Sequence, residues 1–181
     1  MKAQFWSFDV IFAIVIFSIA ITILAFTWYN INNQLSLAYG NGATIMQLQA
    51  ASFAETLLSS GSPSDWESIV NTTNTNTWNF TSIGIGATNG TGISSKKLYT
   101  LMSMANYNYQ ATKQALGIGF DYYITITSTS SNGGSISATI GMNPGKGRAL
   151  TVYVEKRSSF INGNPVQIVI DLWTNTPIGV E

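Results

Sequence analysis

A long apolar run dominates the N-terminal part of the chain. Val10 to Trp28 spans 19 residues, and only Ser18, Thr22 and Thr27 among them are polar. A helix of that length measures about 28 Å, close to the roughly 30 Å hydrocarbon core of a bilayer. Ile, Val and Phe also suit strands, but strands rarely exceed about 10 residues. The run therefore predicts a membrane-length helix.

A cleaved secretory signal is the alternative interpretation of this run. The apolar region of such a signal normally spans about 7–15 residues and ends in a small-residue cleavage site. The run here is longer, and AFTWYNINNQ at its end is a poor site of that kind. Lys2 precedes the run, and no positive charge follows it for a long way. The positive-inside rule then predicts a cytoplasmic N-terminus and an exported body.

Helix-forming residues continue beyond the apolar run, as far as Leu58. Gly40-Asn41-Gly42 interrupts them and predicts either a kink or a break. A continuous helix from Phe5 to Leu58 would measure about 80 Å. Its surface carries almost no charge, unlike an ordinary exposed helix, so we expect its own domain or other copies to cover much of it. One face of its second half would carry Ile45, Leu48, Ser52 and Glu55.

The segment after this helix is polar and rich in turn-forming residues. Gly61 ends the helix, and Ser64 with Glu67 predicts a capping box for one short turn. Three N-x-[ST] sequons follow, which are acceptor sequences for N-glycosylation in exported proteins. The alternative is a polar loop in which Asn and Thr form sequons by chance. The sequons begin at Asn71, Asn79 and Asn89.

Two kinds of periodicity occupy the rest of the chain. SSKKLYTLMSMANYNYQATKQALGI predicts one or two amphipathic helices, capped by Ser94 or Ser95 and ended by Gly117. From Phe120 the period changes to two, and FDYYITITSTS, GSISATIGM, RALTVYVEKRSSFI and PVQIVIDLWT predict strands, with turns at SNGG and NGN. The fold class is therefore α+β, with helices on one face of an antiparallel sheet of about four strands. The helical stripe expected to face the core consists of Leu98, Leu101, Met102 and Ala105.

Composition excludes several kinds of chemistry. The 181 residues include no Cys and no His, which excludes disulfides, Cys/His zinc sites and His-dependent triads. The net charge is zero and charged residues make up 9%, so we expect no nucleic acid partner. The acidic residues are dispersed, and no EF-hand-like spacing appears. We expect no enzyme activity, no cofactor and no metal site.

GMNPGKGR is similar in composition to a phosphate-binding loop. Three residues separate Gly141 from Gly145, where the phosphate loop has four, and Gly147 stands where Ser or Thr should bind magnesium. We therefore predict a hairpin turn at this segment.

KAQFWSFDVIFAIVIFSIAI resembles the class III signal peptides of archaeal type IV pilin-like proteins. In that family a prepilin peptidase cuts on the cytoplasmic side, after Lys or Arg and then Gly or Ala, and the apolar helix is retained. Lys2, Ala3 and Gln4 match this processing motif, because mature members often begin with Gln. The resemblance implies a cut after Ala3. A cut after Gln4 is the alternative, since it would put Asp9 at the fifth mature position, where an acidic residue is common.

A second stretch also resembles archaeal exported proteins of this type. It has a Gly-x-Pro-x-x-Trp turn in SGSPSDW, an Ile-Gly segment in IGIG, a Lys-Leu helix and a Leu-Gly before a strand. The two stretches together cover roughly residues 1–126. The resemblance implies a pilin-like fold in three parts: a short leader at 1–3, a hydrophobic assembly helix at 4–60 and an exported globular head at 61–181.

The resemblance also implies a function, which is that of a structural subunit of an extracellular archaeal type IV pilus-like filament, with surface adhesion as one role. Its partners would be other copies of the chain, the prepilin peptidase and the pilus assembly machinery, and the membrane would hold the helix before assembly at the cell surface. Two alternatives stay open: a single-pass anchored surface binding protein that does not polymerise, and a minor or priming pilin. The residues expected to mediate assembly are Phe5, Asp9, Ile11, Phe12, Ile16 and Phe17.

Asp9 has two interpretations within this scheme. Ser7 or Asp9 can cap the helix by accepting hydrogen bonds from its first backbone N–H groups. Alternatively, Asp9 is a buried carboxylate that pairs with the freed α-amino group of its own or a neighbouring chain. Such a pair would offset much of the cost of burying a charge and would help to fix the subunit register. The two roles can coexist.

Overall fold

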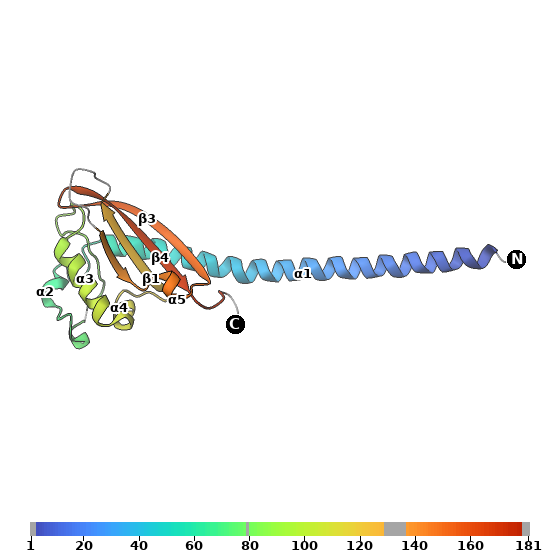
Figure 1. Ribbon diagram of the computed structural model, residues 1–181, viewed down its shortest axis with the longest axis horizontal. Helices are drawn as coiled ribbons and strands as arrows, with labels where there is room; N and C mark the ends of the chain where they lie inside the picture. The colour runs from blue at the N-terminus through green and yellow to red at the C-terminus, as the bar shows by residue number, and fades with distance from the viewer. Residues whose placement is uncertain (1–2, 79, 129–136, 179–181) are drawn as a thin grey trace.

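The computed structural model describes residues 3–78, 80–128 and 137–178, and within the first helix it describes side chains at residues 9–31 and from residue 42 onward. One long helix leads into a globular head, and the fold class is α+β, as the sequence predicts (Figure 1). In chain order the elements are α1 (Ala3–Leu58), α2 (Trp66–Ile69), the 3-10 turn η1 (Thr75–Thr77), α3 (Ser95–Tyr107), α4 (Tyr109–Ala115), β1 (Asp121–Ser128), β2 (Ser137–Gly141), α5 (Pro144–Gly147), β3 (Thr151–Ile161) and β4 (Asn164–Thr174).

The 56-residue helix α1 continues through Gly40-Asn41-Gly42, so the break considered from the sequence is wrong. Gly42 is buried, and a Cβ at this position would overlap Cγ2 of Ile178. The glycine therefore allows the segment after β4 to lie directly on the helix. We define the head as α1 from Gly42 onward together with the described residues of 59–178. The segment after β4 lies beside α1 at the point where the helix leaves the head (Figure 1).

The four strands form one antiparallel sheet in the order β2-β1-β4-β3. Ile124 on β1 is paired with Ile140 on β2 and with Ile170 on β4, so apolar side chains lie side by side on one face. The hairpin predicted at NGN is confirmed: Ile161 pairs with Asn164, and Asn162 and Gly163 form the turn with φ values of 52° and 80°. Positive φ at both positions is what a type I′ turn requires. The predicted SNGG turn lies outside the described residues.

The segment GMNPGKGR does not form a hairpin turn, so that prediction is wrong. Strands β2 and β3 lie at opposite edges of the sheet, and this segment, which contains α5, has to cross from one to the other. It covers Trp173 on the way: the indole Nε1 donates to the carbonyl oxygen of Met142 at 2.9 Å, and a Cβ at Gly147 would overlap the indole ring. The connection therefore closes the end of the sheet.

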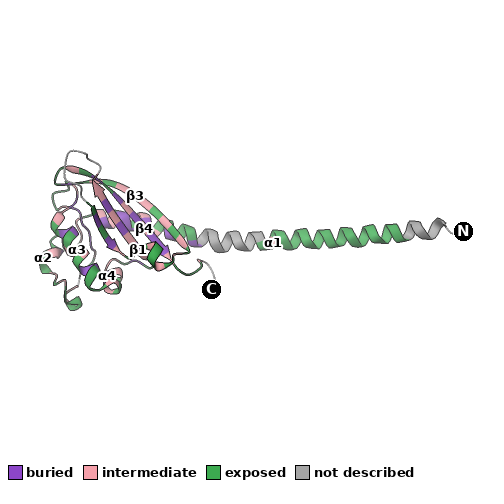
Figure 2. Cartoon of the chain, in the orientation of Figure 1, coloured by how far each residue is buried: buried purple, intermediate pink, exposed green. Residues whose placement is uncertain are grey.

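The head has one core, between the sheet and the helices (Figure 2). Along β1 and along β4 as far as Leu172, buried side chains alternate with exposed or half-exposed ones. Helix α1 packs against β3 and β4, and α3 packs against β2. The predicted cover of helices on one face is thus confirmed. The helical side chains fully excluded from solvent in this core include Met46, Ala50, Leu57, Leu101 and Met104.

Local capping signals in the sequence have mixed outcomes. Ser94 caps α3, because its side chain accepts the Lys97 N–H, and Asn108 ends α3 and caps α4. The capping box predicted from Ser64 and Glu67 is wrong: α2 begins after Asp65, and no side chain caps it. Glu67 instead lies 3.8 Å from the ammonium of Lys96 on α3.

Candidate assembly surface

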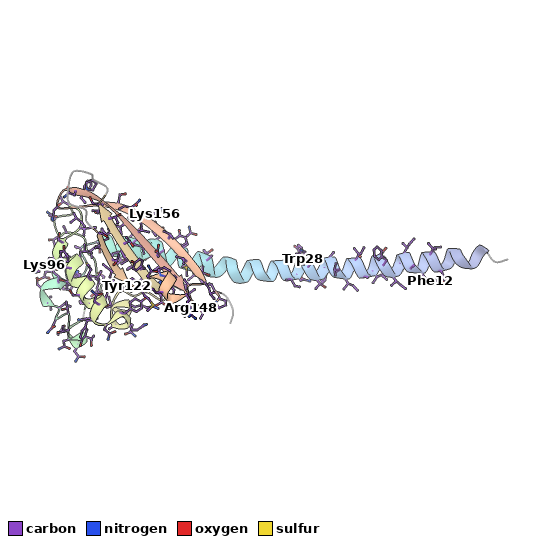
Figure 3. All side chains as sticks on the ribbon, in the orientation of Figure 1. Phe12, Trp28, Lys96, Tyr122, Arg148 and Lys156 are labelled. Atoms are coloured by element: carbon purple, nitrogen blue, oxygen red, sulfur yellow. The ribbon has the colours of Figure 1, made fainter. Side chains whose placement is uncertain are left out.

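The first candidate site is the part of α1 that projects from the head. Asp9–Ile31 is long and apolar enough to cross a membrane, and none of its most apolar part is buried within the chain. We call this segment the arm. Phe12 is 64% exposed and Leu24 is 73% exposed, and Figure 3 shows Phe12 and Trp28 projecting from the helix with no other element beside them. A folded chain that leaves such a surface open needs either lipid or another protein to cover it.

The polar side chains of the arm are satisfied within the helix. The hydroxyls of Ser18, Thr22 and Thr27 each donate, at 2.8 Å, to the carbonyl oxygen four residues earlier. A hydroxyl bonded in this way needs no water. The arm can therefore be placed in a fully apolar environment, lipid or protein, without leaving these groups unpaired.

The residues predicted to mediate assembly all belong to α1. Ile11, Phe12, Ile16 and Phe17 are exposed along the arm. Asp9 is also exposed. Lys2 lies outside the described residues, and Ala3, Gln4 and Phe5 lie in the first turns of α1 with side chains outside the described part.

Asp9 does not stand at the start of the helix. α1 begins at Ala3, so the carboxylate lies well inside the helix, and the first turn contains no acidic residue. The interpretation of Asp9 as an N-terminal cap is therefore wrong for this helix. A carboxylate at such a position, surrounded by apolar residues of the arm, needs a cationic or hydrogen-bonding partner whenever water is excluded from it.

Exposed apolar residues are also found on the part of α1 that belongs to the head. Met46 and Phe53 point into the core, whereas Ile45 and Leu48 are 59% and 66% exposed. The face that the sequence assigns to Ile45, Leu48, Ser52 and Glu55 is thus the one turned away from the sheet. We call it the open face of α1. An anchor alone would need no apolar residues here, because this part of the helix lies beyond membrane length.

The end of α1 and the two residues after it are bonded to two segments that are distant in sequence, residues 85–86 and α3. The Ile85 N–H donates to Leu57 O and the Gly86 N–H donates to Ser59 O, each at 2.7 Å. Lys97 Nζ, on α3, donates to Ser60 O at 2.7 Å and to Gly86 O at 3.1 Å. The last carbonyls of a helix lack partners within it, so the N–H groups of residues 85–86 suit the end of α1, and Lys97 binds the carbonyl two residues after it.

Glycine and tryptophan complete this junction. A Cβ at Gly84 or Gly86 would overlap the carbonyl oxygens of Ser59 and Leu58, so only glycine allows the approach. Trp66 is fully buried, and its Nε1 donates to Gly84 O at 2.8 Å. The Gly-x-Pro-x-x-Trp, Ile-Gly and Lys-Leu segments noted in the sequence therefore meet at one place, where they determine the direction in which α1 leaves the head.

Sequence reasoning missed Lys97. It is only 2% exposed although it is charged, while its neighbour Lys96 projects from the outer side of the head (Figure 3). A signal was present: Lys97 stands four residues before Leu101 and seven before Met104, on the buried stripe of α3. A lysine on an apolar stripe indicates a buried acceptor for its ammonium group.

The titratable groups of the head form a structural network. Asp121 Oδ1 accepts hydrogen bonds from Tyr109 Oη and Lys113 Nζ, both at 2.9 Å. Tyr109 stacks on Tyr122 at 5.2 Å, and burial raises the pKa of both phenols above their usual value of about 10. Within residues 3–78, 80–128 and 137–178, no group of three acidic side chains is placed to hold a metal ion.

Two of the three sequons lie in described, exposed positions. Asn71 Oδ1 accepts from the N–H and the hydroxyl of Thr73, and Asn89 Oδ1 accepts in the same way from Thr91. Both side chains are on the surface of the head. Asn79 lies outside the described residues.

Comparison with known protein families gives no match for the chain, and no curated protein matches its sequence. The layout itself, an apolar N-terminal helix followed by a globular domain with an antiparallel sheet, is compatible with a pilin-like fold.

Proposed function

We propose that this chain is a structural, non-enzymatic subunit of an extracellular type IV pilus-like filament and that it polymerises through α1. The observation that carries the proposal is that α1 exposes apolar residues both within the membrane-length arm and beyond it. This exposed surface includes the arm, and Ile45 and Leu48 are exposed on the open face, in the part of α1 that belongs to the head. A bundle of α1 helices from many copies would cover the whole of this surface.

The energetics of transfer favour such a bundle. Burial of one large apolar side chain stabilises by about 1.5–3 kcal/mol relative to water, so the arm will not stay in water. Lipid covers it before assembly. In the filament, close packing against neighbouring helices replaces lipid contacts, and the gain comes from packing density over many copies. The hydroxyls of the arm are bonded within the helix, so they lose no hydrogen bond when protein replaces lipid around it.

Asp9 fixes the register of this bundle. No other charged residue stands between Lys2 and Glu55. In the bundle its carboxylate pairs with the α-amino group that a prepilin peptidase frees by cutting after Ala3, or after Gln4 in the alternative register. An oppositely charged partner offsets the cost of burying the carboxylate, and a subunit displaced along the bundle loses that partner.

The filament hypothesis is tested by expressing Asp9→Ala and Asp65→Ala chains in cells that lack the natural copy. Both residues are exposed carboxylates, one on the arm and one on the head. We expect both variants to be exported and folded, and only the arm variant to lose surface filaments. Normal filaments from Asp9→Ala chains would rule out its pairing role, and purified filaments without this polypeptide would rule out the filament function.

A single-pass anchored surface binding protein is the second candidate, because the arm has the length and composition of a membrane anchor. Such a protein would be extracted by detergent as a monomer, with its N-terminal leader uncut. A minor pilin is a variant of the first candidate and is distinguished by low abundance in purified filaments. In each case the head is exposed at the cell surface, where it is available for adhesion and for glycosylation at Asn71 and Asn89.

A further inference from the structure

An open cleft of about 780 Å³ lies at the end of the head opposite the arm. Its two walls are the loop that precedes α3 and the turn between β3 and β4, which lie together on this side of the head (Figure 1). The described lining contains no charged residue. Its aromatic residue is Phe160, and its polar side chains are amides and hydroxyls, from Asn89, Thr91, Ser94, Ser95 and Asn162.

The cleft has a preformed shape, because the two walls are bonded to each other. The Ile93 N–H donates to Phe160 O at 2.7 Å, and the Ala87 N–H donates to Gly92 O at 2.8 Å. Gly92 has φ +92°, and a Cβ there would overlap Phe160 O, so the loop approaches β3 as closely as a backbone can. A ligand in the cleft would not need to order these walls first.

The chemistry of the lining suits a neutral saccharide. Phe160 is 55% exposed although it is a large apolar side chain. The face of an aromatic ring packs against the C–H face of a sugar ring, and amides and hydroxyls serve as both donors and acceptors for sugar hydroxyls. An anionic or cationic ligand would find no countercharge among these residues.

The acceptor asparagine of a sequon belongs to the same lining. The Asn89 side chain uses its oxygen for two hydrogen bonds from Thr91, at 3.1 Å from the N–H and 2.7 Å from the hydroxyl. None of the described hydrogen bonds engages Asn89 Nδ2. An N-linked sugar is bonded to this nitrogen, so the first sugar on Asn89 would lie inside the cleft.

We propose that Asn89 carries an N-linked oligosaccharide whose first sugars lie in this cleft against Phe160. The proposal rests on the exported location in the proposed function. In the transfer step Nδ2 attacks the anomeric carbon of a lipid-phosphate-linked oligosaccharide, the C–N bond forms, the C–O bond to phosphate breaks, Nδ2 loses one proton and the lipid phosphate leaves. Covalent attachment places the sugars at an effective concentration of about millimolar, so weak contacts are enough to hold them.

Asn71 provides an internal comparison. Its side chain has the same hydrogen bonds to Thr73 as Asn89 has to Thr91, but it does not line the cleft. A glycan on Asn71 would extend into solvent. A glycan can thus be attached at both sites, but only the glycan on Asn89 is expected to be held in the cleft and shielded from reagents in solution.

The test uses the full chain purified from cells that express it naturally. Glycopeptide mass spectrometry measures occupancy of Asn89, and periodate oxidation of the sugar diols is timed on the folded protein and on the glycopeptide released by protease. We expect oxidation at Asn89 to be roughly tenfold slower in the folded protein, which corresponds to about 1.4 kcal/mol of contact. We expect any glycan on Asn71 to be oxidised at equal rates in the two forms.

Phe160→Ala tests the aromatic contact, and Val154→Ala on the same strand is the matched control, because both side chains are exposed. We expect Phe160→Ala to retain occupancy and lose the protection, and Val154→Ala to retain both. An unmodified Asn89, equal oxidation rates in the two forms, or protection that survives Phe160→Ala would overturn the proposal. Binding of a free oligosaccharide by a chain with bare Asn89 would overturn it too, because the cleft would then take sugars from another source.

Failure of this inference is distinguishable from failure of the proposed function. Filaments whose subunits carry a bare Asn89 would refute the glycan and leave the filament intact. A protected Asn89 glycan on a chain that is never found in filaments would support the glycan and refute the filament function.

Discussion

The ammonium group of Lys97 donates to the carbonyl oxygen of Ser60 at 2.7 Å, and this contact joins α3 to the segment that directly follows α1. The same nitrogen donates to Gly86 O, so one side chain connects three segments. If α1 carries the contacts between subunits, this junction holds the head in a fixed direction relative to the filament axis.

Lys97→Met is expected to destabilise the head by about 2 kcal/mol or more, because a side chain of similar length remains while two acceptors lose their donor. Lys96→Met is the matched control: its ion pair with Glu67 is 3.8 Å long and exposed, and such pairs are worth about 0–1 kcal/mol. Urea unfolding of the two variants measures both changes. Equal, small losses for the two lysines would contradict the role assigned to Lys97.

The contact between Gly42 and Ile178 predicts that Gly42→Ala changes the stability of the head in opposite directions with and without the Ile178 side chain. Gly42→Ala should destabilise the head, because overlap with Ile178 typically costs about 1–3 kcal/mol and exceeds the gain of about 0.8–1.0 kcal/mol in helix propensity. In an Ile178→Gly background the overlap is gone, and the same substitution should become stabilising. Thermal unfolding of the four chains in the cycle checks this. A stabilising Gly42→Ala in the otherwise unchanged chain would show that the glycine is not needed for the approach.

Asp171 predicts a pH dependence of stability. It lies on the half-exposed face of the sheet, paired with Tyr123 on β1 and Val154 on β3, and burial raises the pKa of its carboxyl above the ordinary value of about 3.9. The folded state therefore binds the proton more tightly than the unfolded state does. The resulting stabilisation is complete below the unfolded pKa and is lost as the pH rises through the folded pKa.

Asp171→Asn should therefore be more stable than the unsubstituted chain at pH 7, and the difference should disappear below about pH 4. Unfolding free energies of the two chains measured from pH 3 to pH 7 provide the check. A difference that does not change with pH would assign the effect to packing rather than to the charge.

The open face of α1 predicts a separation between folding and assembly. Leu48→Asn and Ile69→Asn replace side chains that are 66% and 60% exposed, so each should change the stability of the head by no more than about 0.5 kcal/mol. Only Leu48→Asn should prevent filament formation, because only Leu48 lies on α1. Electron microscopy of cells that express each variant measures this. Normal filaments with Leu48→Asn would exclude the open face from the subunit contact.

The sheet, the two-residue hairpin and the cap at Ser94 could be predicted because each depends on local sequence. Alternation of apolar residues places Ile124 and Ile126 on one face whatever surrounds them, and NGN provides the positive φ values that its turn needs. The membrane-length helix can be predicted as well, because it depends on length and composition.

The parts that the sequence did not predict depend on contacts between distant segments. A period of two does not determine strand order, so the sequence predicts a hairpin at GMNPGKGR where the connection in fact crosses the sheet. The burial of Lys97 depends on acceptors at residues 60 and 86, and the need for Gly42 depends on Ile178. Which face of α1 stays open likewise depends on the packing of Met46 and Phe53 into the core.

The measurement that tests the filament proposal most directly is the intact mass of this polypeptide from sheared and purified surface filaments. The proposal predicts that the chain is abundant there and lacks Met1 to Ala3, with Gln4 as its first residue. A chain that retains Met1, and that is recovered only as a detergent-extracted monomer from membranes, would contradict it.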